Sequence, residues 1–278
     1  MKRALNIQAE LQQVNTIQGL TGVFENIASI KIARIRNRVV ASKEFFAVLW
    51  QTYSAIRVEA GERTSQRNIG TRDVFVAITA EGKLSGSADE QVIETMLKEL
   101  QKRKNTDIVV IGMHGASQLE QRKVPVAKSF HMPAGDEDIS VADVIDELAH
   151  YRRINVFYQT YDSLRVQKVT NIELHSTVKE LGSDVEEGAE VVSSRDYIFE
   201  PDLDKIVSYL ESVMLGVALI QVIMESKLSQ YASRFNAMSA GKQRAGFLAT
   251  EYSQQYYRAK RAENDERLKE MMKVVRRG

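Results

Sequence analysis

The sequence LESVMLGVALIQVIMESKLSQYASRFNAMSAGKQRAGFLATEYSQQYYRA, residues 210–259, decides the fold of this 278-residue chain. Apolar or small side chains recur in it at alternating steps of three and four, and the series breaks only at Lys227 and Lys242. Such a seam, sustained over many heptads, is the signature of a coiled coil. We therefore expect one long helix over residues 202–277. The seam consists of Leu210, Val213, Val217, Ile220, Met224, Tyr231, Phe235, Met238, Ala245, Ala249, Tyr252, Tyr256 and Ala259.

A helix of this length needs a partner, because about 75 helical residues extend roughly 110 Å, far beyond the diameter of a small domain. The N-terminal part, residues 1–62, contains no proline and carries a similar stripe. Gly19 and Gly22 weaken this helix locally, since each costs about 1 kcal/mol relative to alanine. The sequence predicts that the two terminal helices pair as an antiparallel coiled coil. The N-terminal stripe consists of Leu20, Phe24, Ile27, Phe46, Leu49, Tyr53 and Ile56.

The middle part, residues 70–195, alternates strand and helix patterns. Short apolar runs at residues 74–78 and 108–111 flank an amphipathic segment at residues 88–103. Strand, helix and strand at these lengths predict a βαβ unit, with parallel strands and a right-handed crossover.

Further elements follow in the same part of the chain. A helix is expected to begin at Ser140, whose spacing to Asp143 resembles a capping box, and to end near Tyr151. Residues 154–174 resemble a β-hairpin that turns at Asp162. The predicted fold class is therefore α/β: an antiparallel coiled coil of long N- and C-terminal helices plus a small central Rossmann-like α/β domain.

Composition excludes several classes of function. Lysine and arginine number 38 against 37 acidic residues, whereas a general binder of nucleic acid or of membrane surfaces is usually more basic. No uninterrupted apolar run approaches the roughly 20 residues that span a bilayer, and the first residues lack the apolar core of a signal peptide. Cysteine is absent, which excludes disulfides and thiolate chemistry. We expect no nucleic-acid partner and no direct membrane insertion.

The usual catalytic patterns are weak. Glycines follow the first middle strand at residues 79–87, but their spacing fits neither GxxxxGK[ST] nor GxGxxG. The four histidines lack metal-ligand spacing, and Ser85 has no GxSxG elbow around it. The acidic run at residues 135–138 lacks the rest of an EF-hand loop. The sequence thus predicts no catalytic, cofactor-binding or metal-binding residues. The histidines are His114, His131, His150 and His175.

Several short segments of the C-terminal part share the spacing of one known family. SRFNAM at residues 233–238 resembles the SRMxAM segment of ATP synthase γ subunits, and YYRAKRA at 256–262 falls in the register of the family's YNRARQA-like segment. Glu225 resembles the family's glutamate upstream on the same helix. YIFEP at residues 197–201 resembles the YxFEP segment that leads into that helix.

The N-terminal half resembles the same family more weakly. Residues 79–86 resemble its TSDKGLCGG loop, which gives the glycine turn a structural role, and residues 21–31 resemble ITxAMxMVAASK. Phe24 replaces a methionine of that motif, and Lys260-Arg261 replaces an arginine–glutamine pair. Because lysine cannot reproduce the bidentate fork of arginine, these departures indicate a divergent branch. A dedicated hydrolytic pump stays open beside ATP synthesis.

The resemblance implies a function and a set of partners. In this family the paired helices form a shaft inside a ring of α and β subunits, and the lower part grips the membrane c-ring. The chain would be the non-catalytic central-stalk rotor of an F-type ATP synthase or ATPase, with an ε-type subunit as a further partner. It would lie on the cytoplasmic, or matrix- or stroma-equivalent, side of an energy-transducing membrane. Such a subunit couples two sites by making different contacts in successive states, and this needs no nucleophile or cofactor. The partner-contact residues so implied are Phe24, Lys31, Glu225, Arg234, Lys260 and Arg261.

Two other classes of function stay open at this point. A coiled-coil adaptor or scaffold unrelated to ATPases would share the long seams, but it would have no reason to carry SRxxAM and YxRAxxA in register. An enzyme with an α/β catalytic core would have to show turnover as an isolated chain. Association with ATPase subunits discriminates against the adaptor.

Overall fold

The computed structural model describes residues 4–60, 70–82, 86–103, 105–135, 139–183 and 203–276. The chain forms two compact units, of which the first comprises Met1–Ser29 with Arg234–Gly278 and the second Ile30–Ser233. Helices α1 (Ala4–Ala60) and α6 (Leu203–Val275) each contribute to both units. The two long terminal helices are therefore confirmed. The predicted three-part division along the chain stays a prediction, because its boundaries fall partly outside the described residues.

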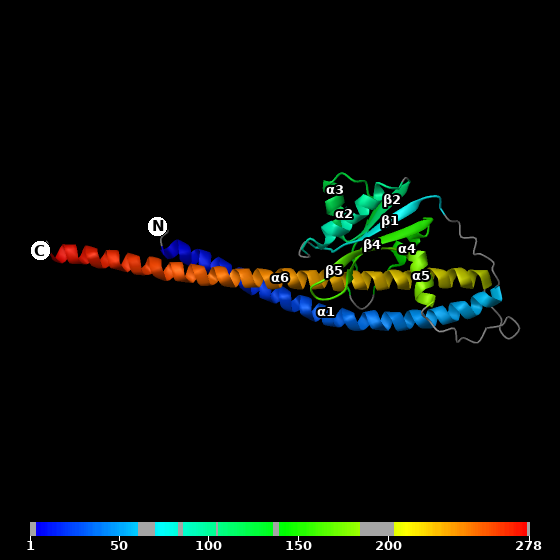
Figure 1. The fold of residues 1–278 in the computed structure, drawn as a ribbon, viewed down its shortest axis with the longest axis horizontal. Coiled ribbons are helices and arrows are strands. Elements are labelled where there is room, and N and C mark those ends of the chain that lie inside the picture. The colour runs from blue at the N-terminus through cyan, green and yellow to red at the C-terminus, as the bar shows by residue number, and fades with distance from the viewer. Residues whose placement is uncertain are drawn as a thin grey trace. The chain divides into compact units, whose positions relative to one another are not determined.

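The second unit contains a five-stranded sheet (Figure 1). Its strands are β1 (Asp73–Ile78), β2 (Thr106–Ile111), β3 (Lys128–Phe130), β4 (Arg153–Tyr161) and β5 (Gln167–Glu173). Their order is β3-β2-β1-β4-β5; the first four run parallel, and β5 is antiparallel to β4. The predicted parallel βαβ unit and the predicted hairpin are both confirmed. Because β4 pairs with β1 on the side away from β2, the strand order reverses between β1 and β4.

Two helical layers cover the two faces of this sheet. The helices are α2 (Ala88–Leu100), α3 (Met113–Gln121), α4 (Ala142–Leu148) and α5 (Leu174–Ser183), with α1 and α6. Successive residues of a strand point to opposite faces, so Val74 and Val76 face one core while Phe75 and Ala77 face the other. The first core includes residues of α1, α4, α5 and α6, and the second includes residues of α2 and α3.

Helix α6 is a core element of the second unit. It contributes Val207, Met214, Leu215, Val217, Ala218, Leu219, Val222 and Ile223 to the first core. One 18-residue stretch of α6 is long and apolar enough to cross a membrane, and 44% of it is buried inside the protein. Core helices pass the same test of length and composition, and packing against the sheet accounts for the buried part.

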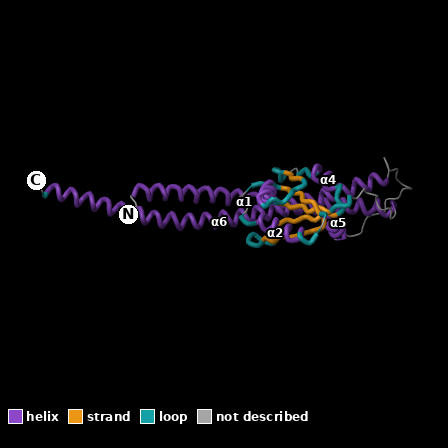
Figure 2. Tube along the Cα trace, turned by 90° about the horizontal axis from the view of Figure 1, so that it is seen from above, coloured by secondary structure: helices purple, strands orange, loops and turns teal. Residues whose placement is uncertain are grey.

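In the first unit, α1 and α6 lie side by side and antiparallel (Figure 2). The backbone N–H of Ala4 donates to Glu263 Oε1 at 2.9 Å, whereas Thr21, further along α1, lies beside Gly241, further back on α6. Leu20, Phe24 and Ile27 are exposed, so the expectation that they continue the buried stripe of α1 is wrong. The reason is that α6 covers the neighbouring face of α1, which presents small and polar residues.

Other departures from the expected elements are local. Helix α4 begins at Ala142 with Val141 as its N-cap and no side-chain capping bond, so the capping box at Ser140 is wrong. Strand β3 and helices α3 and α5 are additional elements; β3 has three residues, too few for a periodic pattern. Three predicted features lie wholly or partly outside the described residues. Residues 83–85 of the glycine turn and residues 136–138 of the acidic run are outside them, as is the whole YIFEP segment at residues 197–201.

Gly112 provides a test of the backbone that joins β2 to α3. Its φ is +107°, and a Cβ there would lie 2.1 Å from the Thr79 carbonyl oxygen. We expect Gly112→Ala to lower the free energy of unfolding by about 2–3 kcal/mol or more, measured by urea denaturation, because strain and a backbone clash combine. Gly82→Ala is the control, since a Cβ at Gly82 meets nothing within 4 Å. Equal urea midpoints for the two variants would show that residue 112 tolerates a side chain and would contradict the expected clash.

Candidate functional site

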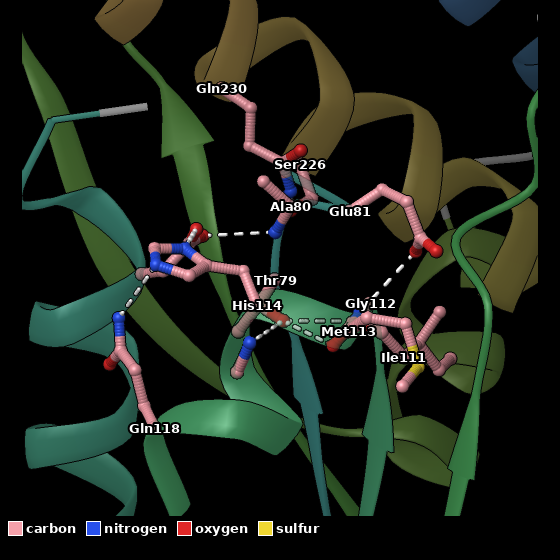
Figure 3. A network of polar contacts seen from close by, with 12 residues as sticks. Thr79, Ala80, Glu81, Ile111, Gly112, Met113, His114, Gln118, Ser226 and Gln230 are labelled. Carbon is pink, nitrogen blue, oxygen red and sulfur yellow. Dashed lines mark hydrogen bonds and ion pairs between the residues drawn. The ribbon is translucent and has the colours of Figure 1, made fainter. Parts of the chain in front are cut away.

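A buried polar network lies where β1 and β2 end (Figure 3). Thr79 directly follows β1; its Oγ1 donates to the Gly112 carbonyl and accepts the backbone N–H of Gly115, both at 3.0 Å. A Cβ on Gly115 would lie 2.5 Å from this hydroxyl oxygen, so glycine is required for the close approach of α3. The network fixes the start of α3 against the end of β1.

A carboxylate and an imidazole extend this network (Figure 3). Asp89, at the start of α2, accepts the backbone N–H of Ala80 at 3.0 Å, and its other oxygen lies 2.6 Å from His114 Nδ1. His114 Nε2 lies 3.4 Å from the Gln118 amide nitrogen. Both ring nitrogens and both carboxylate oxygens thus have partners inside the chain, as expected for buried polar groups. The pair acts as a structural tie between α2 and α3.

Helix α6 lies at the same edge of the sheet: Ser229 Oγ donates to the Thr160 carbonyl near the end of β4 at 3.3 Å, and Ser226 and Gln230 lie on the same turn of the helix (Figure 3). Both side chains are buried, and Gln230 Nε2 donates to Ser226 Oγ at 3.1 Å. In open α/β sheets ligands bind outside the carboxyl ends of the strands. Here the described residues of α6 occupy that place with their own hydrogen-bonded side chains. This geometry agrees with a structural role for the turn after β1.

Glu81 ties three segments together just beyond β1. Its Oε2 accepts the backbone N–H groups of Met113, at 3.3 Å, and Met132, at 2.9 Å, and its Oε1 lies 2.6 Å from His131 Nδ1. Partial burial raises the pKa of this carboxyl, but the hydrogen bonds from His131 and the two amides outweigh burial and hold the pKa below its usual range. The ionised carboxylate is therefore the form that stabilises the fold.

Lys227, one of the two breaks in the α6 seam, is a buried anchor with 4% of its surface exposed. Its Nζ donates to the carbonyl oxygens of Pro133, at 2.8 Å, and Gly135, at 2.9 Å. A buried ammonium requires such partners, because desolvation without hydrogen bonds is costly. The loop after β3 is thereby held at one end by Glu81 and at the other by α6.

Two of the residues predicted to contact partners lie in the second unit. Glu225 is half-buried and accepts a hydrogen bond from Tyr158 Oη at 3.4 Å. Burial, together with the Glu225 charge, raises the pKa of Tyr158. Lys31 is half-buried and takes part in a polar contact. Glu225 is thus committed at least in part to holding α6 against β4.

The other four predicted contact residues lie in the first unit. Phe24, Lys260 and Arg261 are exposed, and Arg234 is half-buried with a partner of its own. Lys260 Nζ lies 5.6 Å from the ring centroid of Tyr256 on the same helix. Phe24 and Lys260 are separated by about 30 Å along the helix pair: Lys242 lies beside Gly22 and precedes Lys260 by 18 residues, and Phe24 lies two residues further along the antiparallel α1. The structure therefore places these residues at different levels and does not gather them into one site.

A set of exposed large apolar side chains in the first unit was not predicted. Large exposed apolar patches mark surfaces for binding other molecules. Except for Leu20 and Ile27, which the sequence placed on the stripe of α1, the sequence signal that could have found them is the occurrence of apolar residues off the 3/4 seam. The set comprises Leu5, Ile17, Leu20, Val23, Ile27, Phe247, Leu248, Tyr257, Leu268, Met271, Met272 and Val275.

A family model described as ATP synthase matches residues 4–273. This chain belongs to the ATP synthase γ-chain family. The ATP synthase gamma chain of Halothermothrix orenii is 23% identical over 94% of both chains. That of Gloeothece citriformis is 26% identical over 92% of this chain and 93% of its own. The family assignment confirms the resemblance seen in the sequence and does not favour an unrelated coiled-coil adaptor.

A solved structure shares the fold of this γ-type chain. A chain of the Euglena gracilis mitochondrial ATP synthase, in a structure of OSCP, F1 and the c-ring, aligns with a TM-score of 0.62 at 14% identity, over 97% of this chain and 93% of that one. The predicted fold class is confirmed, and the predicted α, β and c-ring partners agree with such an assembly. As a family member, the chain is a subunit of a membrane-associated complex that makes or hydrolyses ATP.

The Lys227 anchor predicts a specific loss of stability. Lys227→Met keeps the apolar stem but removes both hydrogen bonds to the loop carbonyls, so we expect the free energy of unfolding to fall by about 1–2 kcal/mol in urea denaturation. Lys205→Met, at an exposed position of the same helix, is the matched control and should change little. If both substitutions shift the midpoint equally, the anchor does not stabilise the loop.

The Glu81 carboxylate predicts a dependence of stability on acid. Because its pKa is lower in the folded chain than in the unfolded one, its contribution is present above the unfolded value of about 4.3 and is lost as pH falls through the folded pKa. We expect Glu81→Gln to be less stable than the parent at pH 7 and to lose less stability between pH 6 and pH 3.5. Urea midpoints across this range measure it. Glu120→Gln, at an exposed position of α3, serves as control and should retain the parent profile.

Proposed function

We propose that this chain is the non-catalytic rotor that couples ion translocation through a membrane ring to ATP synthesis or hydrolysis in a hexamer of α and β subunits. The observation that carries the proposal is the distribution of side chains in the first unit. Four alanines and Ile7 are the buried apolar residues of its described part, while larger apolar side chains such as Phe247 and Leu20 point outward. A helix pair that acted alone would bury the larger residues instead, because burial is favourable in proportion to apolar area.

Outward-facing apolar residues fit a shaft that is surrounded by other subunits. Rotary coupling requires that one surface make different contacts with its neighbours in successive states. Such a surface needs shape, packing and charge, and it needs no nucleophile. In the described part of the second unit, α6 also fills the edge of the sheet where α/β proteins bind ligands. Both features support a mechanical role for this chain, with catalysis in its partners.

The predicted contact residues differ in how much of each side chain is exposed and so available to a partner. Phe24, Lys260 and Arg261 present exposed surface and are proposed to touch the α and β subunits directly. Lys31 and Arg234 are half-buried and are proposed to do so with part of their side chains. Glu225 is proposed to contribute both to a partner contact and to the bond with Tyr158.

The second unit is proposed to bind the membrane c-ring and an ε-type subunit. This places the chain on the cytoplasmic, or matrix- or stroma-equivalent, face of an energy-transducing membrane. The exposed apolar residues Phe45, Val48 and Tyr209 of this unit support a partner surface on its helices.

The test is purification of the tagged full-length chain from its native cells, followed by subunit identification and an ATPase assay. Recovery with a hexamer of nucleotide-binding subunits and with ATPase activity is the expected result. Recovery alone or with unrelated proteins would favour a coiled-coil adaptor. Turnover by the isolated chain would instead favour an enzyme.

Truncation tests the role of the shaft end within the same complex. A chain that ends after Tyr252 keeps the second unit whole but lacks Lys260, Arg261 and the exposed residues beyond them. We expect it to fold in the middle domain, with native β-sheet content by circular dichroism, and to lose most of the ion pumping per ATP hydrolysed. The full-length chain is the control. Undiminished coupling in the truncated complex would contradict the proposed contacts of the shaft end.

A further inference from the structure

The buried apolar seam of the first unit consists mostly of alanines, with Ile7 packed against Tyr252 and Tyr256 near the start of α1. Its buried apolar residues in the described part are Ala4, Ile7, Ala28, Ala245 and Ala259. In coiled coils, register is specified by large knobs that insert into holes and by polar residues at seam positions. An alanine has no side chain beyond Cβ to interlock, so the alanines of this seam specify the register less strongly than large knobs do. A polar contact at a seam position adds to the specification of the register.

Lys242, the second break in the α6 seam, makes such a contact. Its Nζ lies 2.8 Å from Glu25 Oε2 on the facing helix. The Glu25 side chain is only 15% exposed and that of Lys242 is 47% exposed, so the carboxylate is held largely inside the helix pair. The ion pair thus crosses the seam at a position where a coiled coil would otherwise place an apolar residue.

Gly22 lies beneath this crossing. A Cβ on Gly22 would lie 3.7 Å from Lys242 Cε and 3.9 Å from its Nζ, so the stem of the lysine runs over the surface that the glycine leaves bare. These distances are those of ordinary van der Waals contact. The glycine that weakens α1 and the lysine that interrupts the seam of α6 therefore lie against each other.

The pair can form in a single register. Glu25 is the only acidic residue of α1 between Glu10 and Glu44. A shift of one heptad moves the helices by about 10 Å and brings Lys242 opposite Gln18 or Ile32, neither of which carries a charge. A shift in either direction thus loses the ion pair without forming another for this lysine.

We propose that Lys242 and Glu25 form a register lock that, together with the apolar contacts, sets the axial alignment of α1 on α6 in the shaft. These are positioning residues. By fixing one helix against the other, they decide which exposed side chains of the two helices lie at the same level. This role is additional to the coupling function and does not depend on it.

Cysteine crosslinking tests the lock directly, because the natural chain contains no cysteine. A Cβ at Gly241 would lie 3.4 Å from Thr21 Cγ2, so the pair Thr21→Cys with Gly241→Cys reports the observed register. Thr21→Cys with Leu248→Cys reports a shift of one heptad. Both reporters are placed in the full-length chain, and the disulfide yield after mild oxidation is measured on non-reducing gels.

Charge reversal then separates the lock from general packing. Glu25→Lys and Lys242→Glu each oppose like charges, and each is expected to lower the yield of the 21–241 disulfide by about two-fold or more and to raise the 21–248 yield. The double reversal restores the ion pair and should restore the original yields. Unchanged yields in the single variants, or a double variant as low as the singles, would overturn the proposal.

A matched control and a fold measurement complete the experiment. Arg244→Glu changes an exposed charge two residues further along α6 and should leave both yields unchanged. Helix content is followed by circular dichroism. If a single reversal lowers it, Glu25→Gln and Lys242→Gln provide the same comparison without repulsion. A loss of crosslinking in these variants supports the lock, and an unchanged yield contradicts it.

Discussion

The packing of α6 against the central sheet is the constraint on which the second unit depends. The apolar side of this helix supplies eight buried residues to the core on one face of the sheet. Side chains of alternate strand residues complete that core, and α1 joins it through Phe46 and Tyr53. Since the opposite face is covered by α2 and α3, both faces of a mostly parallel sheet are shielded, as such sheets require. One helix thereby serves both as the third layer of an α/β domain and as the start of the shaft.

Two polar side chains interrupt the apolar packing of α6 and join it to distant parts of the chain. The seam of α6 is interrupted by two lysines, and each is tied to a partner distant in sequence: Lys227 to the carbonyls of Pro133 and Gly135, and Lys242 to Glu25. Unpaired, these cations would weaken the seam, because a charge removed from water needs hydrogen bonds to compensate. Paired, they add hydrogen bonds of defined geometry to the apolar contacts of the seam.

The two units differ in how their surfaces relate to function. In the second unit the large apolar residues of β1 and β2 are buried, and polar residues at the sheet edge are bonded to one another. In the described part of the first unit the buried seam is small, and large apolar residues face outward. Membership of a family whose chains work inside larger assemblies explains why large apolar residues are exposed in the first unit. Surfaces that one chain leaves open are covered there by other subunits. The low identities to the relatives, near 25%, leave room for contacts specific to this chain.

The sequence by itself determined the two long helices, the parallel βαβ unit and the hairpin, because periodicity and turn residues act over a few neighbouring positions. It also marked Lys227 and Lys242 as breaks, and its motifs identified the family. Tertiary structure alone decided what those breaks do, which face of α1 meets α6 near Phe24, and that a three-residue segment becomes β3. These outcomes depend on contacts between segments far apart in the chain. The spacing of residues along one segment does not specify such contacts.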